Sequence, residues 1–390
     1  MRLDRHHELF QKSVRAVLER LVMPELDDWE EAAHMPTHQL YRSLGEEGLL
    51  GLTLPVGDGG LGLDIGYAHV WARELGRLPA GSPAMSLSVQ TDIVLPLLAE
   101  EGGADVRATY LRPAVRGELV AALAATEPGG GSDLAAVRTT ALRSSKGLRL
   151  NGEKAFITNG SVADFAVVLC HLREAGTDQD ANRPGGLDSL ALLLVPTNLP
   201  GVYQERYTGK LGNRACDHGR LTFTDVVVPE ENLLGRPGSG YEALTRVFTR
   251  ERTFLAAVCA ARAETMLDRA AAHARGRAVL GRPLLEHQAI SFRLAELDAE
   301  LALVQQYTEA VFHLLDESAA ALRQASIAKL RASRLEREVA DLLLQVHGGE
   351  GYLNGGPVER AYRDARAYGL AGGADEALLH LIAGHPRTGI

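Results

Sequence analysis

A glutamate in the middle of an apolar helical face is the most informative chemical feature of the sequence. In the segment "GYEALTRVFTRERTFLAAVCAARAETML", residues 240–267, Glu251 shares a helical face with Leu244, Val247, Phe248, Phe254, Leu255 and Val258. A carboxylate buried on such a face can have its pKa raised by ~3–5 units, which suits a general base near neutral pH. The alternative is a side chain that bends out to solvent or pairs with an arginine, since Arg250 and Arg252 lie about 100° to either side.

Two glycine-rich segments could hold phosphate or carbonyl oxygens. In "AATEPGGGSD", residues 124–133, three consecutive glycines let backbone amides approach a ligand closely, and Thr126 and Ser132 add hydroxyl groups. In "HGGEGYLNGG", residues 347–356, glycines recur between two helical segments. The first segment lacks the Gly-Lys-Ser/Thr of a Walker A loop, and the second does not follow a strand as a dinucleotide fingerprint would. Plain glycine turns are the alternative for both.

A predicted strand in "EKAFITNGS", residues 153–161, carries an aromatic ring and a hydroxyl two positions apart. Because side chains alternate along a strand, Phe156 and Thr158 are expected on the same face. Such a pair suits a flat heterocycle, with the ring stacking on it and the hydroxyl bonding its edge. Core packing of Phe156 and cross-strand pairing of Thr158 are the alternative.

Composition excludes several other classes of function. The net charge of −9 leaves no basic surplus for nucleic acid or anionic lipid, and no stretch reaches the roughly 18–20 apolar residues of a membrane span. No HExxH, Gly-x-Ser-x-Gly or Cys/His metal motif is present, and Cys170, Cys216 and Cys259 are interpreted as small buried hydrophobes. With no signal-peptide pattern in the first residues, a cytoplasmic enzyme without bound metal is expected.

The elements that must position these residues fall into three blocks. Residues 7–120 have mainly helical periodicity, and short β-branched runs bounded by turns follow from about 121 to 235. Helical periodicity returns from about residue 240 in long segments rich in Ala, Leu and Arg, which indicates a bundle. We therefore predict an α+β protein with an N-terminal helical domain (1–120), a middle β domain (121–236) and a C-terminal helical bundle (237–390). Residues 173–188 are predicted to form a surface loop.

Six segments, in order, resemble the acyl-CoA dehydrogenase family over nearly the whole chain. They are "TEPGGGSD" (126–133), "NGEKAFITNGSVAD" (151–164), "KLGNRACDHGRLTFTDVVVPEENLLG" (210–235), "GRPLLEHQAISFRLAEL" (281–297), "QVHGGEGYL" (345–353) and "YRDARAY" (362–368). The resemblance implies an α domain, an antiparallel β domain and a C-terminal four-helix bundle. It also implies FAD, with the flavin between the β domain and the bundle.

The resemblance assigns expected roles to the residues of the middle domain. Thr126 is expected at the pyrimidine edge of the flavin, and Ser132 at the FAD phosphate or the substrate thioester arm. Phe156 and Thr158 are expected at the isoalloxazine ring and its N5 edge, although many members have tryptophan at the position of Phe156.

Further implied cofactor contacts cross a subunit interface, so a homodimer or homotetramer is expected. The residues that match positions holding the FAD diphosphate and adenine are Arg277, Gln288, Gln345, Gly348 and Gly349.

Several implied cofactor positions depart from the usual family residues. Leu280 stands where an aromatic is usual, and Ala374 stands where a threonine reaches FAD near the C-terminal loop that also contains Glu376. Asp217 and His218 stand where small hydroxyl residues are common. Each departure is expected to weaken one contact without removing the site.

The family places its catalytic glutamate at one of two positions. Many members carry it just after "YRDARIYxIY", where this chain has Gly372. A branch that includes isovaleryl- and long-chain-type enzymes carries it on the bundle helix in a Glu-Arg pair, which "TRERTFLAA" matches at Glu251 and Arg252. Gly372 and Gly373 would then leave space at the substrate for the Glu251 carboxylate, and Arg252 is expected to contact the substrate as well. Asp375 and Glu376 would begin the final helix.

The expected reaction is FAD-dependent α,β-dehydrogenation of an acyl thioester to the 2-enoyl thioester. The acyl group could be carried on CoA or on an acyl or peptidyl carrier protein, and the family implies an electron-transferring flavoprotein as electron acceptor. Two alternatives are a flavin oxidase or monooxygenase on the same fold, and a non-catalytic binding descendant.

Overall fold

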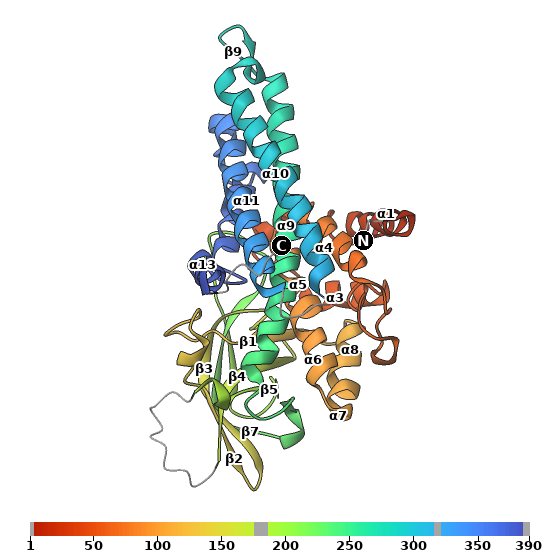
Figure 1. Cartoon of the computed structure of the whole chain (residues 1–390), viewed down its shortest axis with the longest axis vertical. Coiled ribbons are helices and arrows are strands. Elements are labelled where there is room, and N and C mark those ends of the chain that lie inside the picture. Colours follow the sequence, from red (N-terminus) through yellow and green to blue (C-terminus); the bar gives the residue numbers. More distant parts are fainter. Residues whose placement is uncertain (1–3, 175–185, 316–320, 385–390) are drawn as a thin grey trace.

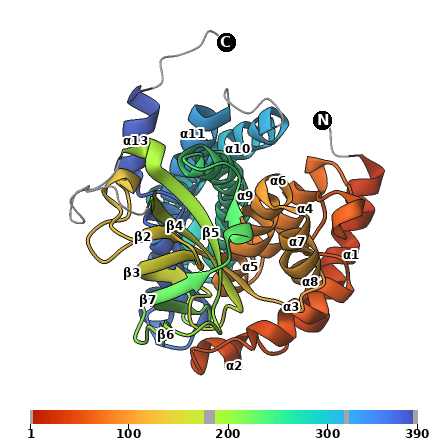
Figure 2. The same ribbon diagram turned by 90° about the horizontal axis from the view of Figure 1, so that it is seen from below.

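The computed structural model describes residues 4–174, 186–315 and 321–384, so most of the predicted loop at 173–188 lies outside the described residues. Helices, a sheet and a long helical bundle follow one another along the chain (Figure 1). Seen from below, the N-terminal helices and the sheet lie on opposite sides of the bundle helix α9 (Figure 2). The predicted three-part α+β fold is confirmed.

The N-terminal part is built of short helices. They are α1 (Arg5–Leu21), α2 (Leu26–Glu31), α3 (Thr37–Glu46), α4 (Ile65–Gly76), α5 (Ser82–Ser88), α6 (Leu95–Glu101), α7 (Ala104–Val106) and α8 (Arg112–Val115). Side chains cap two of the longer ones: Asp4 accepts hydrogen bonds from the first backbone amides of α1, and Asp64 accepts one at α4. A π-helical segment, Val89–Val94, continues α5 into α6 and carries Asp92.

The middle part is one sheet with the strand order β6-β7-β3-β2-β4-β5-β8, and β1 pairs beside β4. The strands are β1 (Ala121–Ala124), β2 (Thr140–Ser144), β3 (Gly147–Thr158), β4 (Phe165–Arg173), β5 (Leu190–Pro196), β6 (Val202–Arg206), β7 (His218–Val228) and β8 (Leu233–Leu234). Most pairs are antiparallel, as expected, but β1 and β2 each run parallel to β4. Strand β4 therefore lies inside the sheet and is apolar and buried along most of its length.

The C-terminal bundle contains three long helices: α9 (Gly240–Gly276), α10 (Gln288–Leu314) and α11 (Ala321–Gly351). The hairpin β9 (Ala278–Val279) and β10 (Arg282–Pro283) joins α9 to α10 at the tip of the bundle (Figure 1). In place of one long fourth helix, the short α12 (Pro357–Ala365) and α13 (Asp375–Gly384) pack on α11.

Helix α9 is more buried than a single apolar stripe predicts. Every residue from 251 to 263 is buried, including Arg252 and Arg262. The reason is that α9 packs against α4, α10 and α11 and also contacts β5, so the stretch from 251 to 263 has no solvent-facing side. The prediction that Arg252 lies outside the buried face is wrong.

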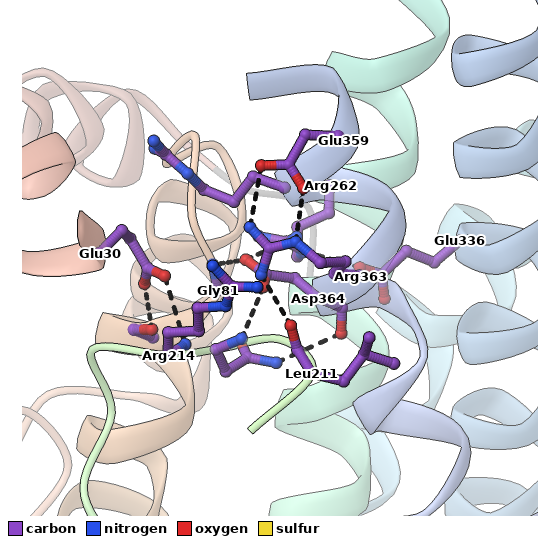
Figure 3. Close-up of polar contacts among 12 residues, drawn as sticks. Glu30, Gly81, Leu211, Arg214, Arg262, Glu336, Glu359, Arg363 and Asp364 are labelled. Atoms are coloured by element: carbon purple, nitrogen blue, oxygen red, sulfur yellow. Dashed lines mark hydrogen bonds and ion pairs between the residues drawn. The ribbon is translucent and has the colours of Figure 1, made fainter. Parts of the chain in front are cut away.

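One carboxylate links all three parts of the fold (Figure 3). Asp364 of α12 accepts hydrogen bonds from the backbone N–H of Gly81 at 3.0 Å and of Asn213 at 2.6 Å. Its Oδ2 lies 3.9 Å from the guanidinium of Arg262, which pairs with Glu336 of α11 at 2.6 Å. These residues are buried, so the network fixes how the helical domain, the sheet and the bundle pack.

None of the described helices is long and apolar enough to cross a membrane. Among the same residues, no group of three or more His, Cys, Asp or Glu side chains could hold a metal ion. The three cysteines are free and buried, which confirms the interpretation of their role in packing.

Candidate active site

The carboxylate of Glu251 is buried in the body of α9 and faces a loop without side chains. Its residue is 8% exposed, and a Cβ atom added at Gly372 would lie 3.9 Å from Oε1. Burial raises the pKa of Glu251 to about 7, and the charge of Asp92 acts in the same direction, whereas Arg252 and Lys329 oppose it. A carboxyl group with this pKa is half ionised near neutral pH, as a general base requires.

The loop at Gly372 and Gly373 has a backbone that only glycine adopts readily. Both residues lie in the left-handed region, with φ of 65° and 96°. A Cβ at Gly372 would also lie 2.5 Å from Cδ1 of Leu255, so α9 itself excludes a larger residue here. The loop therefore places no side chain at Gly372 beside the Glu251 carboxylate.

Two cations hold this loop by its carbonyl groups. Arg252 donates from Nε to the Gly372 carbonyl at 3.3 Å, and Lys329 donates from Nζ to the Gly373 carbonyl at 2.6 Å. Burial lowers the pKa of Lys329 to about 8, against the charges of its neighbours Cys259, Glu251 and Asp375. The Glu251 carboxylate and the loop opposite it thus share one set of buried charges.

Sequence reasoning missed Lys329. The side chain is fully buried on α11, in the segment "ASIAKLRAS". Its helical neighbours Ala325, Ala328 and Ala332 are buried as well. Lys329 therefore interrupts an apolar helical face, as Glu251 interrupts its own. The spacing of this lysine from the alanines was visible in the sequence and could have identified it.

The end of β3, residues 156–158, forms an exposed surface with an aromatic side chain, called here the β3 ledge. Phe156 is 66% exposed, has a φ of 58°, and stacks on Tyr207 with 5.1 Å between ring centres. Thr158 is half-buried, and Ile157 between them is buried. The alternative that Phe156 packs in the core is wrong, because its ring faces out of the fold.

A buried ion pair attaches the glycine-rich loop at 126–133 to this ledge. Glu127 accepts hydrogen bonds from the Thr139 hydroxyl at 2.6 Å and from the Lys154 ammonium at 2.9 Å. The Ala155 amide donates to the Thr126 carbonyl at 3.0 Å, so Thr126 lies beside the residue that precedes Phe156. Ser132 and Gly129 to Gly131 are exposed at the turn of the loop.

The other predicted cofactor residues lie away from this ledge. Arg277 and Leu280 belong to the hairpin at the tip of the bundle, and Gln288 begins α10 after it; Figure 1 shows this tip at the opposite end of the molecule from β3. Gln345, Gly348 and Gly349 are exposed near the end of α11. One copy of the chain therefore does not bring these residues together with Thr126 and Phe156.

The predicted positions at the start of α13 differ in exposure and in their contacts. Ala374 is half-buried beside the glycine loop, and Glu376 is exposed in the first turn of α13. Asp375 is buried at the start of the same helix and accepts from Arg334 at 3.1 Å and Arg337 at 2.7 Å. Both acidic residues begin α13 as predicted, and the arginine contacts of Asp375 were not foreseen.

Comparison with known proteins gives the same three-part division. The models of the acyl-CoA dehydrogenase N-terminal, middle and C-terminal domains match residues 4–118, 122–226 and 238–385. The mitochondrial long-chain specific acyl-CoA dehydrogenase of Rattus norvegicus is 32% identical over 377 residues, which cover 97% of this chain and 85% of that protein. The mitochondrial short-chain specific acyl-CoA dehydrogenase of Mus musculus is 32% identical over 383 residues, which cover 98% and 90%.

The similarity extends to three dimensions. A crystal structure of acyl-CoA dehydrogenase from Geobacillus kaustophilus superimposes with a TM-score of 0.91 at 33% identity, covering 98% of each chain. Matches to all three domains, at this identity and over almost the full length, establish the relationship. The chain belongs to the acyl-CoA dehydrogenase family, whose members are FAD-using flavoenzymes that oxidise a CH–CH bond of an acyl-CoA.

Proposed function

We propose that the chain oxidises an acyl thioester to its 2-enoyl thioester and that Glu251 is the base. The observation that carries this proposal is the buried Glu251 carboxylate beside the side-chain-free loop at Gly372. The proposal assigns the chain to the branch of the family that carries its glutamate on the bundle helix.

Glu251 takes the proton from the α-carbon of the acyl chain. The α C–H bond is only weakly acidic, so its ionisation needs a base whose proton affinity is raised by exclusion of water. The buried carboxylate provides this, and it carries the proton away as a neutral carboxylic acid. The electron pair of the broken α C–H bond forms the Cα=Cβ double bond as the β-hydrogen leaves with its own pair.

FAD fits the exposed ledge of the sheet. Phe156 offers a flat aromatic face, Thr158 offers a hydroxyl beside it, and Thr126 and the amides of Gly129 to Gly131 lie on the attached loop. The strained φ of Phe156 keeps its ring turned outward, which supports a role in contacting a ligand. FAD, when bound, supplies the acceptor for the β-hydrogen and its electron pair.

The complete cofactor site is proposed to form between two copies of the chain. Arg277, Gln288, Gln345, Gly348 and Gly349 are the residues that a second copy would contribute. Exposed apolar side chains on the bundle support such an interface: Leu280 (91% exposed), Phe292, Leu303, Tyr352 and Leu353. The assembly is then a homodimer or a homotetramer.

The proposed substrate class is defined by its thioester and not by the length of its acyl chain. The long-chain and short-chain relatives are equally similar at 32% identity, so overall similarity favours neither. The acyl group is carried on CoA or on a carrier protein, since the chemistry at the α- and β-carbons is the same. We propose an electron-transferring flavoprotein as the acceptor that reoxidises the enzyme.

Anaerobic mixing of the FAD-loaded protein with acyl thioesters tests the proposal. Butanoyl and hexadecanoyl groups on CoA and on a phosphopantetheinylated carrier protein form a suitable panel, and loss of the yellow flavin absorbance is the readout. Bleaching by at least one member with slow reoxidation in air supports a dehydrogenase, and rapid oxygen consumption favours an oxidase or monooxygenase. Protein that binds no FAD would indicate a non-catalytic descendant.

A further inference from the structure

A chain of polar groups lies directly behind the hydroxyl of Thr158. Thr158 ends β3 and His218 begins β7, and the two residues are paired in the sheet. Nε2 of His218 lies 3.3 Å from Oγ1 of Thr158, and its Nδ1 lies 3.1 Å from the Nζ of Lys210. Sequence comparison with the family treated His218 only as a departure from the usual small hydroxyl residue.

The hydrogens available to Lys210 determine which nitrogen of His218 accepts. An ammonium group has three N–H donors and no acceptor. Lys210 directs them to the carbonyl of Asn213 at 2.8 Å, to the carbonyl of Cys216, and to Nδ1 of His218. Nδ1 lies 3.4 Å from the Cys216 carbonyl, which could accept a hydrogen from it, but the Lys210 ammonium is nearer at 3.1 Å and can only donate. The Cys216 carbonyl already accepts from Lys210, so we assign Nδ1 as an acceptor.

His218 is neutral near pH 7, because burial and then the charge of Lys210 lower its pKa to about 4. A neutral imidazole carries one hydrogen, and with Nδ1 accepting, that hydrogen is on Nε2. The acid nearest in sequence does not change this arrangement. The carboxylate of Asp217 accepts from the amide and hydroxyl of Ser161, at 2.8 Å and 2.5 Å.

The tautomer of His218 determines the direction of the Thr158 hydroxyl hydrogen. Its Oγ1 accepts the Nε2 hydrogen, so its own hydroxyl hydrogen is directed away from His218, and Thr158 makes no other side-chain hydrogen bond among the described residues. We propose that His218, held by Lys210, is a positioning residue that presents the Thr158 hydroxyl as a hydrogen-bond donor to FAD. This inference depends on the proposed function, because it requires FAD on the β3 ledge.

Nitrogen NMR tests the arrangement without reference to activity. Magic-angle-spinning spectra of protein labelled with ¹⁵N-histidine report the tautomer, and the signal that disappears in His218→Gln identifies the residue among 13 histidines. We expect the neutral tautomer with hydrogen on Nε2 at pH 7.5. Hydrogen on Nδ1, or on both nitrogens, would overturn the inference.

A double-mutant cycle tests the effect on FAD. The amide of His218→Gln can still donate to Thr158, whereas the carboxylate of His218→Glu can only accept, so it turns the Thr158 hydroxyl inward. We expect His218→Glu to bind FAD about fivefold more weakly than His218→Gln, as the loss of one hydrogen bond predicts. With Thr158→Val as background the two variants should bind FAD equally, because no hydroxyl remains to be turned.

The outcomes separate this inference from the proposed function. If wild-type protein binds no FAD in the same titration, the proposed function fails. Suppose instead that wild type binds FAD. If the FAD affinities of His218→Gln and His218→Glu differ by the same factor with Thr158 and with Val at position 158, His218 does not act through Thr158. The same conclusion follows if the two affinities are equal when Thr158 is present. Should Thr158→Val itself abolish FAD binding, the tautomer seen by NMR decides.

Discussion

The carboxylate of Glu251 and the backbone of Gly372 face each other across the candidate site, with Oε1 3.9 Å from where a Cβ at Gly372 would lie. The two positions are 121 residues apart in sequence, and the family resemblance places the catalytic glutamate at one or the other of them. In this chain, one position carries a buried carboxylate and the other carries no side chain. The pairing of a buried acid with a side-chain-free loop is the central relationship of the site.

The rate of flavin reduction should depend on pH through Glu251. Burial raises its pKa to about 7, so the carboxyl group loses its proton only as the pH rises through that value. We expect the rate at limiting substrate, measured by anaerobic stopped flow, to increase with pH with a midpoint of about 7. A midpoint near the ordinary glutamate value would contradict the buried environment.

Replacement of Lys329 by methionine should move that midpoint to higher pH. The ammonium group favours the ionised form of Glu251, so its removal makes the carboxylate harder to form. The other charged groups nearby, Arg252 and Asp92, remain in place. The measurement is the same pH profile, with Lys146→Met at an exposed turn as the control. An unchanged midpoint in a variant that still binds FAD would show that Lys329 has no electrostatic influence on the base.

Gly372→Ala should destabilise the protein by about 2 kcal/mol. The added methyl group meets Leu255 at 2.5 Å, and the φ of 65° is unfavourable for any residue with a Cβ. Urea unfolding measures the free energy of unfolding. Gly103→Ala is the control, because Gly103 has a negative φ and open space around it, and it should change stability by less than about 0.5 kcal/mol. Equal stability of the two variants would be inconsistent with the packed loop described above.

Asp364→Asn should destabilise the protein by about 3 kcal/mol. The amide cannot accept from both Gly81 and Asn213 as the carboxylate does, and Arg262 loses one of its two acidic neighbours. Because Asp364 contacts all three parts of the fold, the loss should appear in the global unfolding transition in urea. Asp298→Asn, at an exposed position on α10, is the matched control. A loss no larger than that of the control would mean that the network does not hold the domains together.

The order of helices, sheet and helices was predictable because the spacing of apolar residues changes from helical to strand-like near residue 121 and back to helical near residue 240. The runs that became β3, β4, β5 and β7 are apolar or β-branched segments bounded by turns, so their strands were predicted. Strands β1 and β6 were missed, since β1 is the short alanine-rich "AALA" and β6 is the mostly polar "VYQER". Their strand conformation comes from pairing with β4 and β7, which no local pattern reports.

The burial of Glu251 was predictable because one helix carries the signal. Glu251 interrupts the apolar spacing of its own helix, and Phe156 and Thr158 are two positions apart on one strand. Lys329 and His218 lie on other elements and meet Glu251 and Thr158 only after folding, so spacing along the chain did not connect them. The contacts of Arg277 and Gln288 would depend on a second copy of the chain, which one sequence does not arrange in space.

The most direct test of the base is flavin reduction by Glu251→Gln. The amide keeps the size of the side chain but cannot accept the α-proton, so FAD and substrate should still bind. Single-turnover flavin reduction by the acyl thioester that bleaches wild type most rapidly is the measurement. We predict a rate lower by at least about 10³-fold with unchanged flavin content. Reduction at the wild-type rate would contradict the assignment of Glu251 as the base.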